Sequence, residues 1–151
     1  MLNYRLFEEK DYPFFAELIS ASEAWHEEEC RPDQAEEYMT SYKMYNGTWL
    51  IWMKSAEKIG ISFHLNWAPS NEKPWIGTVL IHPKHRNQGL GMKMIEQISA
   101  QLKGDGHKAV FAGCPASRLD WLKFLGGCGF EQLKSEKDSE GKEYIITVKP
   151  V

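Results

Sequence analysis

Long apolar runs are missing from this sequence. The longest apolar stretches include Trp49–Met53 and Trp75–Ile81, and both are far shorter than the ~20 residues that a membrane-spanning helix needs. Charged residues also interrupt the first stretch of the chain, MLNYRLFEEKDY, so we expect neither a secretory signal nor a membrane anchor there. These absences argue against a membrane as a partner of this protein.

Cysteine is scarce as well. The three cysteines, Cys30, Cys114 and Cys128, are odd in number and form no Cys-x-x-Cys pair. A disulfide framework or a zinc site built on cysteine is therefore not expected. We interpret them as free thiols in a reducing compartment, and this predicts a cytoplasmic location.

The sequence has no strong excess of charge of either sign. Its formal net charge is -3, so nothing in the balance points to nucleic acid as a partner. His82 and His85 flank a proline, but no third ligand lies nearby, and we expect no metal site. Hydrophobic residues make up 42% and charged residues 26% of the 151 residues. That composition and length predict one folded domain over residues 1–151.

Apolar periodicity and turn signals predict a mixture of strands and helices. A strand, a helix and a second strand follow one another in the middle of the chain, which implies two parallel strands joined by a helical crossover. We expect the flanking strands to pair antiparallel. The predicted fold class is therefore α/β or α+β. The expected strands are Asn3–Phe7, Trp49–Lys54, Ile59–Leu65, Trp75–His82, Lys108–Cys114, Phe130–Lys134 and Tyr144–Lys149. One helix is expected to start at Asp11, and the others are expected over Pro32 to about Tyr45, Met92–Leu102 and Ala116–Leu125.

The segment richest in chemistry is the turn from Arg86 to Gly91, between an apolar strand and a helix. The first turn of a helix presents backbone N–H groups without partners and a partial positive charge. Gly89 and Gly91 lack a Cβ, so an anion can come close to the backbone. Met94 stands where a Rossmann fingerprint has its last glycine, and no Gly-Lys-Ser/Thr follows. The turn predicts a diphosphate site of another kind, although glycines used only for turn geometry remain an alternative.

The six residues Arg86-Asn87-Gln88-Gly89-Leu90-Gly91 resemble the (Gln/Arg)-x-x-Gly-x-(Gly/Ala) signature of the GNAT acetyltransferases. The resemblance continues upstream through the strand end Val79–Pro83 and downstream to Cys128-Gly129-Phe130, which is similar to the family's x-Gly-Phe. It covers roughly residues 75–133. The resemblance implies a mixed, mostly antiparallel central sheet with a parallel strand-helix-strand core and helices on both faces.

The resemblance also implies acetyl-CoA as co-substrate and places its contacts residue by residue. In the family the two central parallel strands splay apart, and the cofactor lies in the opening. The backbone of Val79, Leu80 and Ile81 would pair with the pantetheine arm as an added strand, and an N–H of this strand would polarise the thioester carbonyl. The residues that would hold the diphosphate are Arg86, Asn87, Gln88, Gly89, Leu90, Gly91 and Met92, with the Arg86 side chain adding a fixed positive charge.

The chain departs from the family pattern at the general acid. The family often has a tyrosine four residues before the glycine of Gly-Phe, whereas Leu125 stands there. A thiol with a pKa near ~8.5 leaves tolerably as its anion, so catalysis is not excluded. Candidate substitutes for the acid are Tyr144, Cys128 and Ser117. The alternative interpretation of Cys128 is that it is only a small buried residue.

The strand before the turn also carries no evident general base. An amine acceptor has a pKa near ~10.4 and must lose a proton before attack. If Ile59–Leu65 pairs symmetrically with Trp75–Ile81, His64 stands opposite Trp75, close to where a base is needed. An ordinary histidine at a strand end is the alternative, and Glu72 is a further candidate.

These features predict an N-acetyltransferase that moves an acetyl group from acetyl-CoA to a primary amine of a small molecule or a protein. The alternative is a non-catalytic acyl-CoA-binding module, because the usual tyrosine is missing. The expected partners are an amine acceptor and a second copy of the chain in a homodimer.

Overall fold

The structure is a computed structural model that describes residues 2–22, 31–34, 37–38 and 47–151. The chain divides into two compact units. One comprises Met1–Leu65 and Thr78–Gly91, the other Asn66–Gly77 and Met92–Val151. Each unit is described by itself, and one domain over residues 1–151 stays a prediction. Most of the helix expected from Pro32 to Tyr45 lies outside the described residues.

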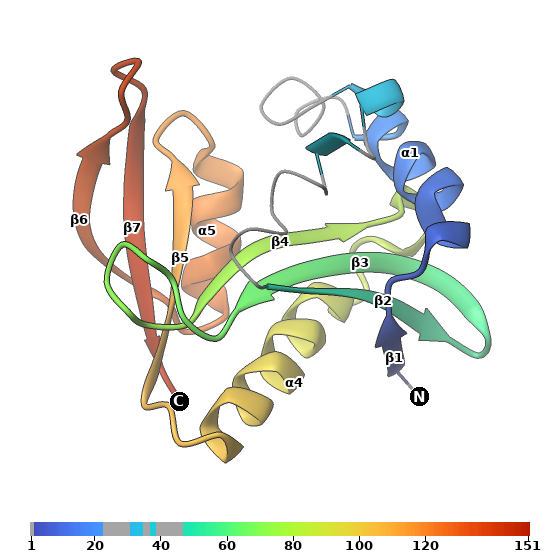
Figure 1. The fold of residues 1–151 in the computed structure, drawn as a ribbon, viewed down its shortest axis with the longest axis horizontal. Helices are drawn as coiled ribbons and strands as arrows, with labels where there is room; N and C mark the ends of the chain where they lie inside the picture. Colours follow the sequence, from blue (N-terminus) through green and yellow to red (C-terminus); the bar gives the residue numbers. More distant parts are fainter. Residues whose placement is uncertain (1, 23–30, 35–36, 39–46) are drawn as a thin grey trace. The chain divides into compact units, whose positions relative to one another are not determined.

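The first unit is an antiparallel sheet with a helix against it (Figure 1). Strand β1 pairs antiparallel with β2, and β2 pairs antiparallel with β3. Ile51 of β2 stands opposite Arg5 on one side and Ile61 on the other. The elements of this unit are β1 (Leu2–Leu6), η1 (Glu9–Asp11), α1 (Tyr12–Ser20), η2 (Pro32–Gln34), β2 (Thr48–Lys54), β3 (Glu57–Leu65), most of β4 (Trp75–Ile81) and η4 (Pro83–His85).

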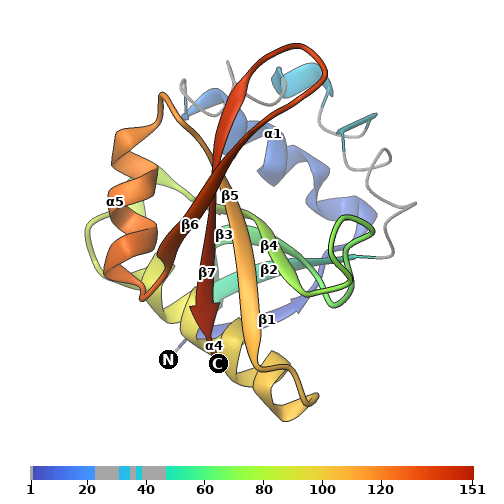
Figure 2. The ribbon, with the colours of Figure 1, turned by 90° about the vertical axis from the view of Figure 1, so that its left-hand side faces the viewer.

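The second unit begins at Asn66, in the loop before β4, and contains the parallel pair. Trp75 of β4 pairs with Phe111 of β5 in parallel, and Phe111 N donates to Pro74 O at 2.9 Å. Strand β7 lies between β5 and β6 and is antiparallel to both (Figure 2). The other elements are α4 (Leu90–Gly104), β5 (Ala109–Pro115), α5 (Leu119–Gly127), β6 (Glu131–Lys137) and β7 (Glu143–Pro150). Mostly antiparallel strands with one parallel pair confirm the predicted fold class.

Helix α5 ends later than the sequence predicts. The expected end was Leu125, before two glycines, but the helix continues to Gly127. The residue that ends it is Gly129, whose φ of 97° lies in the left-handed region. Phe130 N then donates back to Leu125 O at 3.0 Å. Glycine can stay within a helix at some cost, and it is the left-handed position after the last turn that requires it.

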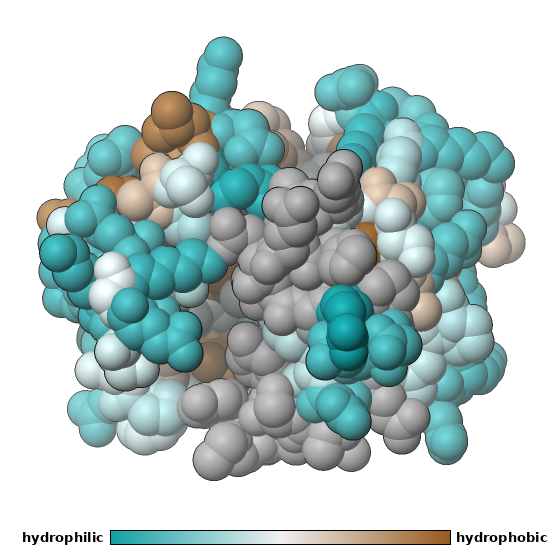
Figure 3. Space-filling view, turned by 90° about the horizontal axis from the view of Figure 1, so that it is seen from above, coloured by the Kyte–Doolittle hydropathy of each residue, from teal (hydrophilic) through white to brown (hydrophobic). Residues whose placement is uncertain are grey.

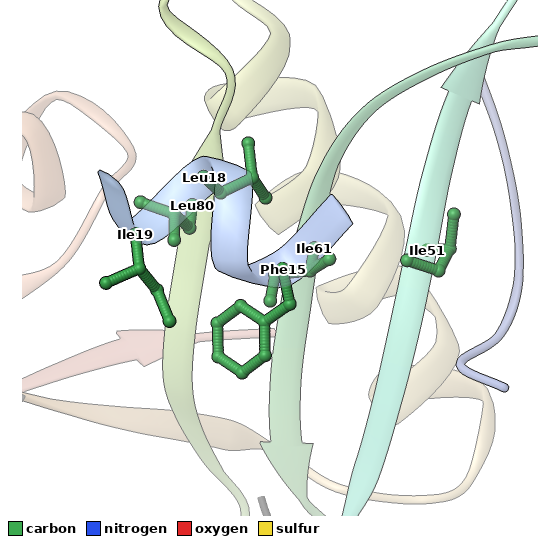
Figure 4. Packing of buried hydrophobic residues seen from close by; sticks show 6 residues of the cluster. All are labelled: Phe15, Leu18, Ile19, Ile51, Ile61 and Leu80. Atoms are coloured by element: carbon green, nitrogen blue, oxygen red, sulfur yellow. The ribbon is translucent and has the colours of Figure 1, made fainter. Parts of the chain in front are cut away.

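The core of the first unit lies between α1 and the sheet. Leu18 and Ile19 lie three and four residues after Phe15, so the three side chains share one face of α1. All three are fully buried. Figure 4 shows them directed toward the strands that carry the remaining members of the cluster, Ile51, Ile61 and Leu80. Burial of this face fixes α1 against β3 and β4.

Asp11 precedes α1, but its side chain makes no capping hydrogen bond to that helix. The Asp11 carboxylate is fully buried and accepts from Arg5 Nη1 and Nη2 at 2.7 and 2.8 Å. It also accepts from Lys58 Nζ at 2.7 Å and from Glu8 N at 2.8 Å. The bonds from Arg5, and then those from Lys58, hold the pKa of Asp11 far below its usual range. The group joins β1, β3 and the start of α1.

The buried face of α4 and the middle of β5 contribute most of the second unit's buried side chains. Met94, Ile95, Ile98 and Leu102 follow helical spacing and are each at most 1% exposed. Cys114 and Cys128 carry thiols, as predicted, and both are buried, whereas Cys30 lies outside the described residues. Large exposed hydrophobic residues are few, and in the space-filling view hydrophobic atoms form small separate patches (Figure 3). No helix in the described part of the chain is long and apolar enough to span a membrane.

Leu125 has the environment of a core residue, with 0% of its surface exposed. The Leu125→Ala variant should lower the free energy of unfolding by about 2–5 kcal/mol, because it removes buried methyl groups and leaves a cavity. Leu119 lies on the same helix and is 70% exposed, so Leu119→Ala should change stability by no more than about 0.5 kcal/mol. Urea denaturation of both variants checks this. Equal effects at the two positions would contradict the packing role of Leu125.

Candidate functional site

The candidate site is the turn between β4 and α4. After Ile81, the one-turn helix η4 is capped by His82, whose Nδ1 accepts from Lys84 N at 3.2 Å. The backbone is then extended at Arg86 and left-handed at Asn87 and Gly89, with φ of 63° and 73°. We call residues 86–91 the Arg86–Gly91 loop.

Gly89 leaves the approach to this loop open. A Cβ built on Gly89 would meet nothing within 4 Å, so the glycine serves the left-handed backbone and not a tight packing contact. Arg86, Asn87, Gln88 and Gly89 are exposed, whereas Leu90 is only 4% exposed and fixes the start of α4. The structure therefore presents Arg86 to Gly89 together on the surface, before a 15-residue helix whose first residues, Leu90 and Gly91, are buried.

The side chain of Arg86 is committed to the protein. Its Nε donates to Ile81 O at 3.0 Å, and its Nη2 donates to the hydroxyl of Ser22. Desolvation of the guanidinium lowers the pKa of Arg86, which stays charged at neutral pH. The sequence predicted a charge for the diphosphate and missed Ser22, because no local pattern connects a residue after α1 with this loop.

Carboxylates of the first unit hold η4, which precedes the loop. Glu57 Oε1 lies 3.0 Å from Lys84 Nζ and 3.4 Å from His85 Nε2. The hydrogen bonds from Lys84, and secondly from His85, lower the pKa of Glu57. His82 Nε2 lies 3.3 Å from Glu17 Oε1 on α1. These contacts fix the turn to β3 and α1.

The β4 residues proposed for the pantetheine arm have their side chains turned away from solvent. Val79 and Leu80 are 8% and 5% exposed, so it is chiefly their backbone that could bind a ligand. A Cβ at Gly60 would lie 2.5 Å from Leu80 O, so glycine there permits the close approach of β3 to β4. Ile81 O already accepts one bond from Arg86.

His64 is a buried residue of β3. It stands opposite Thr48 of β2 and is 1% exposed. The symmetric pairing that set it opposite Trp75 would also set Ile59 opposite Leu80. Instead Ile59 O accepts from His82 N at 2.8 Å, so the predicted register is wrong by two residues at this end.

The cause of the shifted register is the hairpin turn. The turn closes where Ala68 N donates to Lys73 O at 2.9 Å. Counting outward from Ala68 and Lys73, one residue at a time along each strand, brings Ile59 opposite His82. Glu72, the other candidate base, is an exposed residue of this turn with a left-handed φ of 60°.

The candidate acids lie in the second unit. Tyr144 of β7 stands opposite Pro115 of β5 and is half-buried, with Lys142 Nζ 5.4 Å from the centre of its ring. Burial is the main cause that raises the pKa of the Cys128 thiol, so this thiol stays protonated at neutral pH. Ser117 is exposed before α5. Within the described residues, no three His, Cys, Asp or Glu side chains are grouped to hold a metal ion.

Comparisons with solved structures show the same fold in two acetyltransferases. The aminoglycoside acetyltransferase AAC(6')-Ib in complex with coenzyme A matches with a TM-score of 0.82 and 18% identity over 99% of this chain and 95% of that chain. A GNAT family acetyltransferase from Elizabethkingia anophelis with acetyl-CoA bound matches with a TM-score of 0.75 and 15% identity over 99% and 98% of the two chains. The predicted acetyl donor agrees with the ligands of both.

Comparison of sequences shows the family. The chain is 52% identical over 134 residues to the Uncharacterized protein YkzC of Bacillus subtilis (strain 168), a match that covers 89% of this chain and 94% of that protein. The model of the Acetyltransferase (GNAT) family matches residues 12–130. Because that match covers well over half of its length, the chain belongs to the GNAT family, which confirms the predicted family and enzyme class.

Proposed function

We propose that this chain is an N-acetyltransferase that transfers the acetyl group of acetyl-CoA to a primary amine of a small molecule or a protein. The observation that carries the proposal is the Arg86–Gly91 loop, which is exposed from Arg86 to Gly89 and has an open, left-handed Gly89 just before α4. Family membership supports acetyl transfer. The aminoglycoside acetyltransferase among the structural neighbours supports an amine acceptor. The odd number of cysteines, with no Cys-x-x-Cys pair, favours the cytoplasm as the location of this protein.

The proposed diphosphate ligands are the backbone amides of Asn87, Gln88, Gly89, Leu90, Gly91 and Met92. The predicted amide of Arg86 already donates to Pro83 O at 3.2 Å. Amides at the start of a helix have no helical partner and carry the positive end of the macrodipole, so they suit an anion. The exposed loop residues let a diphosphate reach them. The backbone of Val79, Leu80 and Ile81 would pair with the pantetheine arm as a strand does.

The proposed reaction is attack of a neutral amine on the thioester carbonyl. The new C–N bond forms as the carbonyl π electrons move to oxygen, and a β4 backbone N–H would stabilise that oxyanion. Collapse of the intermediate breaks the C–S bond, and coenzyme A leaves as thiolate. One amine proton passes to a base and one proton reaches the thiolate. We propose His64 as the base, acting through water because it is buried, and Tyr144 as the acid.

The His64→Gln variant should lower turnover by about 10²–10⁴-fold at neutral pH, with acetyl-CoA affinity nearly intact. Histidine can accept a proton near neutrality, and the deficit should shrink as pH rises and the neutral amine becomes abundant. A pH–rate profile of wild type against His64→Gln measures this, with His107→Gln as a control at a histidine outside the proposed site. Parallel profiles of equal height would assign His64 a structural role and move the base to Glu72.

Thiol release from acetyl-CoA with a panel of amines tests the proposed function. We expect amine-dependent release of coenzyme A with at least one of a polyamine, an aminoglycoside and a lysine peptide. Tight binding of acetyl-CoA with no release above the hydrolytic background for any amine would favour the alternative, a non-catalytic acyl-CoA-binding module. That alternative is retained because Leu125 stands where the family often has a tyrosine.

A further inference from the structure

We infer that Arg86 is a positioning residue that couples the end of α1 to the Arg86–Gly91 loop through Ser22, and that its side chain is not a ligand of the diphosphate. The inference rests on the proposed function, since it concerns the loop that is proposed to bind acetyl-CoA. It assigns Ser22, for which no role was predicted from the sequence, to the support of that loop.

The guanidinium of Arg86 joins two elements of the first unit. One bond runs from Nε to Ile81 O at 3.0 Å and closes the chain back onto the end of β4, across η4. The other runs from Nη2 to Ser22 Oγ. Ser22 is 8% exposed and follows α1 directly, with its own N donating to Ile19 O at 3.1 Å. A planar guanidinium held at two edges has little freedom to turn toward a ligand.

The location of the charge also favours a supporting role. The C-terminal end of a helix carries partial negative charge from its unpaired carbonyls, and a cation there is stabilised. Ser22 places the Arg86 guanidinium at the end of α1. The positive charge is therefore balanced by α1 and by the Ile81 carbonyl, and the backbone amides of the loop remain the groups suited to the anion.

A second contact ties the same helix to the same turn. Glu17 of α1 lies 3.3 Å from His82 Nε2, and His82 Nδ1 accepts from Lys84 N. The opposite face of α1 is fixed by the buried Phe15, Leu18 and Ile19. Helix α1 therefore contacts the turn before the loop at His82, and Ser22 after this helix contacts Arg86, the first residue of the loop. A loop ordered before binding loses less conformational freedom when the ligand arrives, and this raises affinity.

Calorimetry with acetyl-CoA tests the coupling in a double-mutant cycle. Ser22→Ala and Arg86→Gln should each raise the Kd for acetyl-CoA by about 5- to 10-fold, the order expected for losing a bond to a charged group. The double variant should lose no more affinity than the single variant with the larger loss, because both changes remove the same hydrogen bond. Ser22→Thr keeps a hydroxyl and should retain most of the affinity, and Ser70→Ala, at an exposed serine outside the coupling, should leave it unchanged.

Three results would overturn the inference. Wild-type Kd in Ser22→Ala with a large loss in Arg86→Gln would make Arg86 a direct ligand, as would additive losses in the double variant. If Arg86 were a direct ligand, Arg86→Gln would also make the Kd less dependent on salt concentration. The positioning role predicts that the slope of Kd against salt concentration stays unchanged. Failure of the wild type to bind acetyl-CoA would instead contradict the proposed function. Thermal unfolding of each variant serves as the control that it is folded.

Discussion

The Gly89→Asp variant should bind acetyl-CoA about 100-fold more weakly than the wild type, or worse. A carboxylate at this position would stand where the diphosphate is proposed to lie, and like charges in close contact cost several kcal/mol. Because a Cβ at Gly89 meets nothing within 4 Å, the side chain itself fits, and the loss should fall on the ligand. Turnover of S-acetylpantetheine, which has no diphosphate, should be nearly unaffected.

Gly141 provides a matched control for this substitution. It has a φ of 83°, against 73° for Gly89, and a Cβ there also meets nothing within 4 Å. Both aspartates would suffer the same left-handed strain of ~1–2 kcal/mol, but Gly141 lies in the turn between β6 and β7. Gly141→Asp should therefore bind acetyl-CoA like the wild type. Equal affinities of folded Gly89→Asp and Gly141→Asp would refute the loop as the diphosphate site.

The Asp11→Asn variant should lower the free energy of unfolding at neutral pH by about 2–4 kcal/mol. The substitution removes the charge that pairs with Arg5 and Lys58 and leaves the amide in a fully buried position. The loss stays below the largest values known for buried pairs, because the Arg5 and Lys58 side chains are 28% and 34% exposed and can be hydrated. Asp105→Asn, at an exposed carboxylate after α4, should have little effect.

The same carboxylate makes stability depend on pH in a known direction. The pKa of Asp11 is lowered in the folded protein, so its contribution is fully present above the unfolded pKa near ~3.9 and is lost as pH falls toward the folded pKa. Denaturation curves from about pH 6 down to pH 3 should show the gap between wild type and Asp11→Asn narrowing only below about pH 4. A gap that stays constant over that range would contradict the role of the Asp11 charge.

The sequence predicted the features that depend on neighbouring residues. Apolar spacing located the strands and helices, and a helix between two apolar strands implied the parallel pair that Trp75 and Phe111 form. The order of Arg86, Gly89 and Gly91 after a strand predicted a loop at a helix start, and the structure shows that loop. Local backbone requirements, such as the left-handed Gly89, leave a visible trace in the sequence.

Contacts between distant parts of the chain left no such trace. The bond from Arg86 to Ser22 spans 64 positions and the pair of Lys58 with Asp11 spans 47, and no local pattern announces either. The register of β3 and β4 failed for a related reason, since it depends on where the turn closes, at Ala68 and Lys73. A shift of two residues keeps every side chain on its face, so the apolar pattern alone could not detect it.

The most direct test of the proposed function follows the acetyl group itself. Wild-type protein is incubated with acetyl-CoA labelled in the acetyl group and with the amine that best releases coenzyme A, and the product is identified by mass spectrometry. We expect one labelled acetyl group in amide linkage to the amine for each coenzyme A released, and strongly reduced product with Gly89→Asp but not with Gly141→Asp. Coenzyme A released in step with labelled acetate, without any acetylated amine, would contradict it.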